Sequence, residues 1–280
     1  MTRQEQLVFC KKCTNRDFNI TEGVLCKLTG KKADFEDTCP DYHLDKKMVI
    51  KGLPSKKIKP NEKRAAMATT MIWAVLAINL FALVSNYFQY DLLQELDQGI
   101  DVTEAELTAN DLRVGLISVL YLLIYIISGI TFIQWFRRAY NNLAARTKID
   151  HNEGWAAGAW FVPIICLFRP YTIMKELFVK TNKLLRDRSG LATEGNEMTL
   201  VGLWWALWII VGYIGNYSIK MIFKEDTIES LLKSTIADMA TSVMEIPIGI
   251  LAIWMVATLA KKESQLLGLE KEELKKMEAA

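Results

Sequence analysis

Hydrophobic residues of this chain are concentrated in four long runs, which charged segments separate. The runs cover residues 67–88, 114–136, 200–219 and 240–260. The hydrocarbon core of a bilayer is about 30 Å thick, and a helix needs roughly 20 mostly apolar residues to cross it. The runs contain no Lys, Arg or Asp, and Glu245 is their one acidic residue. Since a domain of this size has no core that buries four such helices, the pattern predicts four transmembrane helices.

A fifth apolar segment, residues 155–168, is too short to cross. It has 14 residues, which as a helix span about 21 Å. Pro163 lies inside it and Pro170 follows it, and both disfavour a continuous helix. Irregular backbone at membrane depth needs cover from protein or from a wet cavity. We therefore expect a re-entrant or interfacial segment.

The distribution of basic residues predicts the orientation. Residues 1–66 hold 15 Lys and Arg, residues 137–199 hold ten and the tail from Lys261 holds five, whereas loops 89–113 and 220–239 hold one and three. Basic residues collect on cytoplasmic loops. If the short segment does not cross, 30 basic residues lie inside and four outside; if it crosses, the counts become 22 and 12. The first arrangement fits better and places both termini in the cytoplasm.

Four regions follow from this pattern: a head (1–45), a basic linker (46–66), a membrane domain (67–260) and a charged helical tail (261–280). The chain has 34 basic and 32 acidic residues, a net charge of +2, which excludes a strongly basic nucleic-acid binder as a description of the whole chain. Residues 1–60 show no apolar segment of the kind found in a cleavable signal peptide. The first span is therefore expected to serve as the uncleaved targeting signal.

The head contains four cysteines with the spacing of a metal site: Cys10, Cys13, Cys26 and Cys39. In a reducing cytoplasm, metal binding is expected before disulfide formation. Zinc favours four thiolates in a tetrahedron, and a closed site of this kind is structural. Two alternatives are open: His43 replaces one of the four cysteines as a ligand, or the head folds without a metal. Seven apolar side chains are expected to form its small core: Leu7, Phe9, Phe18, Ile20, Val24, Leu25 and Phe35.

The linker is strongly basic: residues 46–64 carry eight basic residues and one acid. Its simplest role is to hold the first span in the inside-positive orientation. Contact with anionic lipid head groups is compatible with that role and is worth around 1 kcal/mol per basic residue near the surface. Nucleic-acid binding has no patterned aromatic set to support it.

The second span is followed by a dense motif. It reads QWFRRAYNNLA over 134–144, GWAAGAWFVP over 154–163 and FRPY over 168–171, with a Glu-Leu pair at 176–177. This resembles a bacterial membrane family known only as a domain of unknown function, number four-three-two-eight in that series, over roughly residues 70–260. The head resembles a zinc-ribbon-like module that precedes membrane domains in Bacteroidetes-type bacteria. Neither resemblance implies a known activity, so no catalytic residue is carried over.

Two interpretations of this motif are open. In one, a cytoplasm-facing pocket holds an anionic head group or small solute and is lined by Arg138, Asn142, Arg169, Tyr171 and Glu176. In the other, which we favour, the motif is a fold-stabilising elbow that ties the short segment to the ends of the spans. Residues 171–185 read as an amphipathic helix lying on the membrane.

Several polar and aromatic residues near the spans are further candidates. Glu245 is a candidate for function because acids inside membranes are costly. Asn79 and Asn216 are expected to form hydrogen bonds between helices. An interfacial aromatic belt accounts for Trp204, Trp205 and Trp208.

The sequence as a whole predicts an all-α integral membrane protein with a zinc-ribbon-like head, and a binding protein in preference to an enzyme. The resemblance implies that it lies in the inner membrane of a bacterium. Its head and basic face are expected to contact a protein partner or lipid. One alternative is a small-solute transporter or channel subunit, on the basis of the broken segment and Glu245. Another is a lipid-head-group enzyme that uses Glu176 or His151 as a base.

Overall fold

The computed structural model describes residues 2–45, 58–190, 195–222 and 227–278, and most of the predicted basic linker therefore lies outside the described residues. Four long helices dominate: α3 (Glu62–Asp97), α4 (Glu104–Arg146), α7 (Glu197–Ile222) and α8 (Ile228–Glu278). Each contains one predicted span, and each is long and apolar enough to cross a membrane. The prediction of four membrane helices is confirmed at this level.

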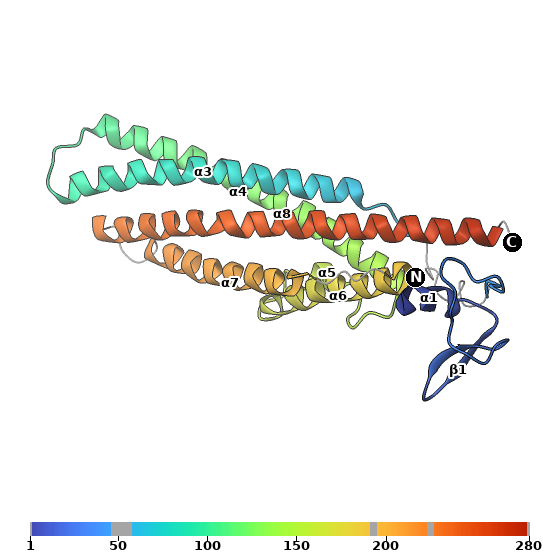
Figure 1. Ribbon diagram of the computed structural model, residues 1–280. Coiled ribbons are helices and arrows are strands. Elements are labelled where there is room, and N and C mark those ends of the chain that lie inside the picture. The colour runs from blue at the N-terminus through green and yellow to red at the C-terminus, as the bar shows by residue number, and fades with distance from the viewer. Residues whose placement is uncertain (1, 46–57, 191–194, 223–226, 279–280) are drawn as a thin grey trace.

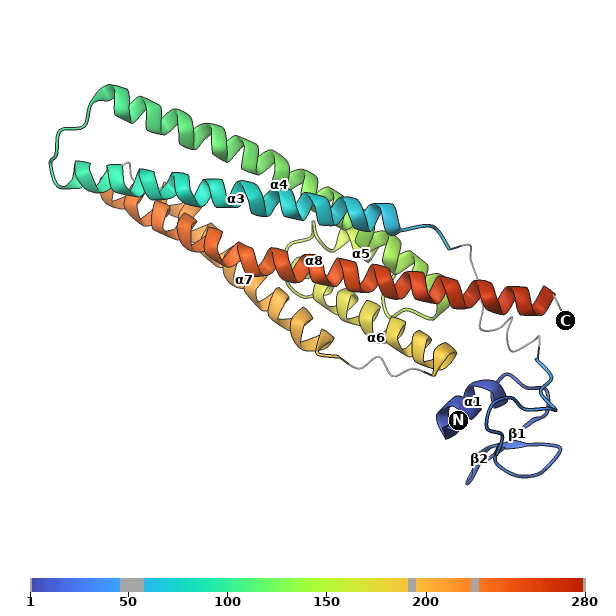
Figure 2. The same cartoon turned by 45° about the horizontal axis from the view of Figure 1, so that its top comes forward.

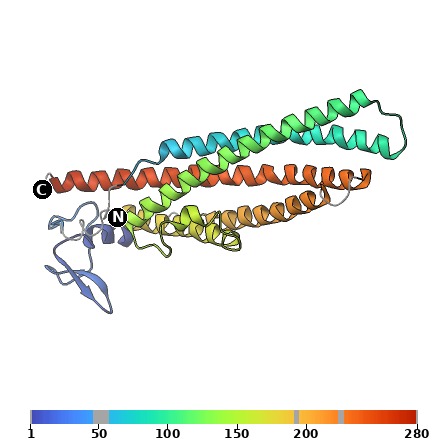
Figure 3. The same ribbon diagram turned by 180° about the vertical axis from the view of Figure 1, so that it is seen from behind.

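The long helices lie side by side (Figures 1 and 2): α3 packs along both α4 and α8, and α7 packs along α8. The loop 98–103 between α3 and α4, the C-terminal end of α7 and the N-terminal end of α8 lie at one end of the bundle (Figure 1). The head and the C-terminal end of α8 lie together at the other end, as the view from behind also shows (Figure 3). Four crossings of a bilayer require this arrangement.

Three of the helices are much longer than a bilayer is thick. The lengths of α3, α4 and α8 are 36, 43 and 51 residues, which correspond to about 54, 65 and 76 Å against a hydrocarbon core of about 30 Å. They therefore extend beyond the apolar region. The predicted charged tail is not a separate segment, because α8 continues without a break to Glu278.

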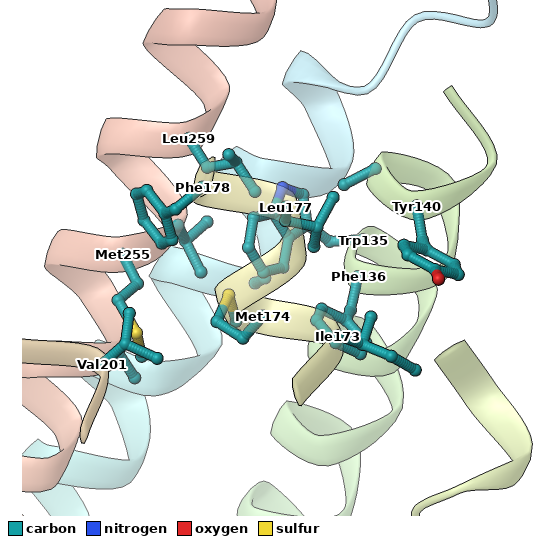
Figure 4. Packing of buried hydrophobic residues seen from close by; sticks show 14 of the residues in the cluster. Trp135, Phe136, Tyr140, Ile173, Met174, Leu177, Phe178, Val201, Met255 and Leu259 are labelled. Atoms are coloured by element: carbon teal, nitrogen blue, oxygen red, sulfur yellow. The ribbon is translucent and has the colours of Figure 1, made fainter. Parts of the chain in front are cut away.

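The buried core lies near the head end of the bundle, where α6 (Arg169–Ser189) enters between the long helices. Figure 4 shows Met174, Leu177 and Phe178 of α6 among side chains of α4 and α8. Residues from six helices, α3 to α8, make up this core; its largest fully buried side chains are Trp135, Phe136, Tyr140, Ile173, Met174, Leu177, Phe178, Val201, Met255, Val256 and Leu259.

This position of α6 corrects an expectation from the sequence. The apolar stripe over 171–185 was expected to lie on the membrane, but Ile173 and Met174 are fully buried against other helices. An amphipathic face has the same pattern whether lipid or protein covers it. The helix ends at Gly190, whose φ of 70° is a left-handed conformation that glycine adopts readily.

The half of the bundle away from the head exposes apolar side chains instead. Large hydrophobic residues of α4 are about half exposed along the run 114–136, including Leu116, Val119, Leu123 and Ile127. An apolar helix surface without protein cover is the pattern of a helix in contact with lipid.

Helices α3 and α8 approach each other closely. A Cβ at Gly249 would lie 2.6 Å from Leu76 Cδ2, so any larger residue at this contact would force the Leu76 side chain to move. Asn79 Nδ2 donates to the Ser242 backbone oxygen at 2.7 Å, which confirms the expected hydrogen bond between helices. The same expectation for Asn216 was wrong, because its side chain donates to Gly212 of its own helix.

The head contains helix α1 (Arg3–Cys10) and an antiparallel pair of strands, β1 (Arg16–Asn19) and β2 (Gly23–Cys26). Phe9 packs edge-on against Phe35 and Tyr42, with ring centroids 6.0 and 5.8 Å apart. Phe18 and Ile20, expected in this core, are 73% and 94% exposed. They lie at the free end of the hairpin, which extends away from the core of the head.

Candidate functional site

The connection between α4 and α6, residues 147–168, is called the elbow below. It contains two short helical pieces, α5 (Trp155–Gly158) and η1 (Ile165–Leu167). Arg169 Nη1 donates to His151 Nδ1 at 2.6 Å, and the Arg169 guanidinium lies 5.7 Å from the Trp155 ring centroid. The two ends of the elbow therefore meet.

The tip of the elbow is apolar and exposed. Phe161 and Ile164 are 75% and 74% exposed. Ile164 has a φ of 67°, a conformation that is strained for a β-branched residue. This turn reverses the direction of the backbone and returns it toward Arg169.

Glu176 fixes the elbow to the bundle. Its carboxylate accepts hydrogen bonds from the Tyr140 hydroxyl of α4 at 2.7 Å and from the Asp150 backbone N–H at 2.6 Å. Lys180 Nζ donates to the same carboxylate at 2.6 Å and to Asp150 Oδ1 at 2.8 Å. The hydrogen bond from Lys180 lowers the pKa of Asp150. Since Glu176 is buried, these partners compensate the cost of placing its charge away from water.

Tryptophans of α7 cover the other side of the elbow. Trp205 stacks on Trp208 with a centroid distance of 4.7 Å, and both rings contact Trp160 edge-on at 6.2 Å. Trp205 Nε1 donates to the Leu167 backbone oxygen at 2.9 Å. Trp204 and Trp205 are buried in the protein, so the expectation that they belong to an interfacial belt was wrong.

A second feature, the basic hollow, lies between the start of α3 and the end of α4. It has a volume of about 440 Å³ and is lined by Lys59, Arg64, Gln134, Arg137, Arg138, Asn141, Asn142, Ala145 and Glu153. Four of these residues are cationic and one is acidic. Arg64 and Arg137 are close enough to Arg138 to act on it electrostatically. A hollow of this charge favours an anionic ligand.

Asn142 attaches the end of the linker to this hollow. Its Oδ1 accepts from the Lys59 backbone N–H at 3.1 Å, and its Nδ2 donates to the Lys59 backbone oxygen at 2.9 Å. The Asn142 amide also donates to Glu263 of α8. Lys59 is thereby held at the edge of the hollow.

The five residues predicted to line one pocket are thus divided between two places. Arg138 and Asn142 line the basic hollow. Arg169 and Glu176 hold the elbow, and Tyr171 stacks on Trp205 at 6.4 Å. Arg138 and Tyr140 are two residues apart on α4, a rotation of about 200°, and so the two groups occupy different faces of that helix.

An ion-pair network connects the head with the hollow. Lys12, between two of the cysteines, pairs with Glu273 of α8. Arg188 of α6 pairs with Glu273 at 3.1 Å and with Glu270 at 3.5 Å. Arg146 of α4 then contacts Glu270 through Nε at 2.8 Å and Glu263 through Nη1 at 3.8 Å.

Most of this network is buried, since the side chains of Arg146, Glu270 and Arg188 are only 2%, 6% and 6% exposed. Sequence reasoning missed it because its members lie far apart in the chain: Arg146 and Glu270 are 124 residues apart. The sequence predicts only a charged helical tail over 261–280, and the contacts of its charges with α4 and α6 follow from the continuation of α8 as one helix to Glu278.

The four head cysteines line a common hollow of about 120 Å³. All four are free thiols. Burial raises the pKa of Cys10; the charge of Arg3 opposes this shift, and the other three cysteines add to it. In the described ranges, no three His, Cys, Asp or Glu side chains are grouped closely enough to hold a metal ion as they stand. The donors fit zinc in type and number, and binding would require the thiols to move inward.

Glu245 lies in α8 and faces α4. The Tyr121 hydroxyl lies 2.7 Å from both of its carboxylate oxygens. This contact supplies a structural partner for the one acid in the predicted spans.

Comparison with known proteins gives a family but no activity. No curated protein and no solved structure matches the chain. A family model described as a domain of unknown function (DUF4328) matches residues 98–261, which include α4, the elbow, α6, α7 and the membrane part of α8. The match begins after α3, later than the expected start near residue 70, and does not include the head. The elbow and the α4 side of the basic hollow are therefore features of the matched region, and the chain belongs to the DUF4328 family.

Proposed function

We propose that this chain is a non-enzymatic protein of the bacterial inner membrane that holds a zinc-stabilised head at the cytoplasmic surface for contact with a protein partner or lipid. The observation that carries the proposal is the position of the four thiols. They line one hollow of a head that is ion-paired, through Lys12 and Glu273, to the end of a membrane helix. The head is thus fixed to the bundle and not merely tethered to it.

Zinc would be held by Cys10, Cys13, Cys26 and Cys39. A head of about 45 residues has little apolar core, and metal binding supplies folding free energy in such small units. With four protein ligands no position is open for substrate, so the metal would be structural.

The elbow contacts argue against a lipid-head-group enzyme with Glu176 or His151 as base. Glu176 is occupied by Tyr140, Asp150 and Lys180, and the His151 Nδ1 accepts from Arg169. The contact of Glu245 with Tyr121 likewise gives that acid a structural role and weakens the transporter alternative.

Metal content tests this proposal. Protein purified in detergent without chelator is expected to contain about one zinc atom per chain. Cys13→Ser should lose the metal, because Cys13 is the buried thiol of the head. Cys166→Ser is the matched control and should retain it, since Cys166 belongs to the elbow. Elemental analysis against protein concentration gives the ratio; equal zinc in both variants, or none in the wild type, contradicts the proposal.

A further inference from the structure

We infer that the basic hollow is a binding site for a phosphate group, and that the phosphate of an anionic phospholipid is its natural occupant. The inference rests on the proposed membrane placement of the helices, but not on a metal in the head. It goes beyond the proposed function because it assigns a ligand class to a defined set of residues.

The charge of the hollow is the first argument. Lys59, Arg64, Arg137 and Arg138 line it, against one acid, Glu153. Arg138 lies near two like charges, Arg64 and Arg137. The repulsion among these three cations is unfavourable unless an anion lies between them. Guanidinium groups bind phosphate oxygens in pairs of parallel hydrogen bonds, which gives both energy and geometry.

The second argument is the position of the hollow along the helices, at the boundary between their apolar and charged parts. Arg64 precedes the apolar run 67–88 by three residues, and Arg137 follows the run 114–136 directly. Both helices therefore change from apolar to charged at the level of the hollow. In a bilayer this boundary is where lipid phosphates lie, and basic pockets between membrane helices on the cytoplasmic side bind such head groups.

The third argument is that hydrogen bonds hold the lining residues of the hollow in place. Asn142 holds Lys59 at its edge through two backbone hydrogen bonds, and the Arg64 guanidinium donates to the Gln134 backbone oxygen at 3.1 Å. Asn141 Oδ1 is buried and has no hydrogen-bond partner in the described part of the chain. A glycerol hydroxyl beside a bound phosphate is a donor that would satisfy it.

The test is a titration of the full-length protein in dodecyl maltoside with phosphatidylglycerol, in parallel with phosphatidylcholine, glycerol phosphate and inorganic phosphate. Ligands that bind only the folded state raise the melting midpoint, and the concentration dependence gives an apparent Kd. Phosphatidylglycerol is expected to raise the midpoint, and phosphatidylcholine is not. Arg138→Gln and the more exposed Arg137→Gln should each weaken this binding about tenfold, because each removes a charge-assisted contact.

Lys63→Gln is the matched control. It removes one positive charge from the same end of α3 but lies outside the lining of the hollow, and its apparent Kd should equal that of the wild type. Equal weakening by Lys63→Gln and Arg138→Gln, unchanged binding in both arginine variants, or an equal response to phosphatidylcholine would overturn the inference.

The soluble probes distinguish the source of the phosphate. Competition by glycerol phosphate or inorganic phosphate at the concentration of the lipid would support the site but assign it to a soluble phosphate. Zinc content measured on the same samples separates this result from the proposal for the head, because a zinc-free head with intact lipid binding contradicts only the latter.

Discussion

Replacement of Arg146 by methionine is expected to lower the free energy of unfolding by about 3–5 kcal/mol, because it removes a buried cation from two buried carboxylates. Glu263 loses its contact with Arg146, and Glu270 keeps only the 3.5 Å pair with Arg188 among its ion pairs described above. The Arg146 side chain is 2% exposed and contacts Glu270 and Glu263, whose side chains are 6% and 15% exposed. Methionine preserves most of the volume, so the effect measures the charge and its hydrogen bonds. For a domain of this size the melting midpoint in detergent should fall by roughly 10 °C.

An exposed ion pair provides the control for Arg146. Lys233 pairs with Glu229 on α8, but these side chains are 51% and 75% exposed. Water and salt screen such surface pairs, so they contribute little to stability, and Lys233→Met should hardly change the midpoint. Equal melting midpoints for Arg146→Met and Lys233→Met would show that the buried network does not stabilise the fold as proposed. Addition of Glu270→Met to Arg146→Met should recover part of the loss, since removing both charges is less costly than removing one.

Replacement of Glu176 by alanine is expected to release the elbow and to cost about 2–4 kcal/mol. The substitution removes the acceptor of the Asp150 backbone N–H and the 2.7 Å hydrogen bond of the Tyr140 hydroxyl, which keeps only longer contacts with the His151 backbone, at 3.2 and 3.3 Å. Hydrogen exchange should therefore accelerate over residues 147–168 more than over the centres of the long helices.

Asp150→Asn distinguishes the role of Glu176 from that of its neighbour. This substitution removes the ion pair of Asp150 with Lys180, but the Asp150 side chain is 66% exposed. The pair is expected to be worth less than about 1 kcal/mol, and Glu176 still accepts from the backbone at this position. If Asp150→Asn and Glu176→Ala accelerate exchange in the elbow equally, Glu176 is not the anchor described above.

The membrane helices could be predicted from the sequence because the hydrophobic pattern that identifies each of them is local. Each run is long enough to show its character without reference to the rest of the chain. The elbow was also predictable in kind, since Pro163 and the length of the segment exclude a crossing helix. Its anchoring was not, because Glu176 meets Tyr140 only after the chain has turned back on itself.

The errors have a common physical cause, which is that an apolar surface does not specify what covers it. The apolar face of α6 and the indoles of Trp204 and Trp205 match both lipid and protein, and here protein covers them. Phe18 and Ile20 show the opposite error, since they were expected in the head core and are exposed. The predicted pocket was also wrong about which side chains lie together, because the rotation along α4 places Arg138 and Tyr140 on different faces of that helix.

The central claim is that four helices cross the bilayer with the head and the elbow on the cytoplasmic side. A membrane-impermeant thiol reagent tests it directly, because all five native cysteines lie in the head or the elbow. Wild-type protein in intact spheroplasts should not react, whereas a Gln98→Cys variant, altered in the exposed loop at the opposite end of the bundle, should react without permeabilisation. Labelling of the wild type from outside, or labelling of Gln98→Cys only after the membrane is opened, would contradict the account.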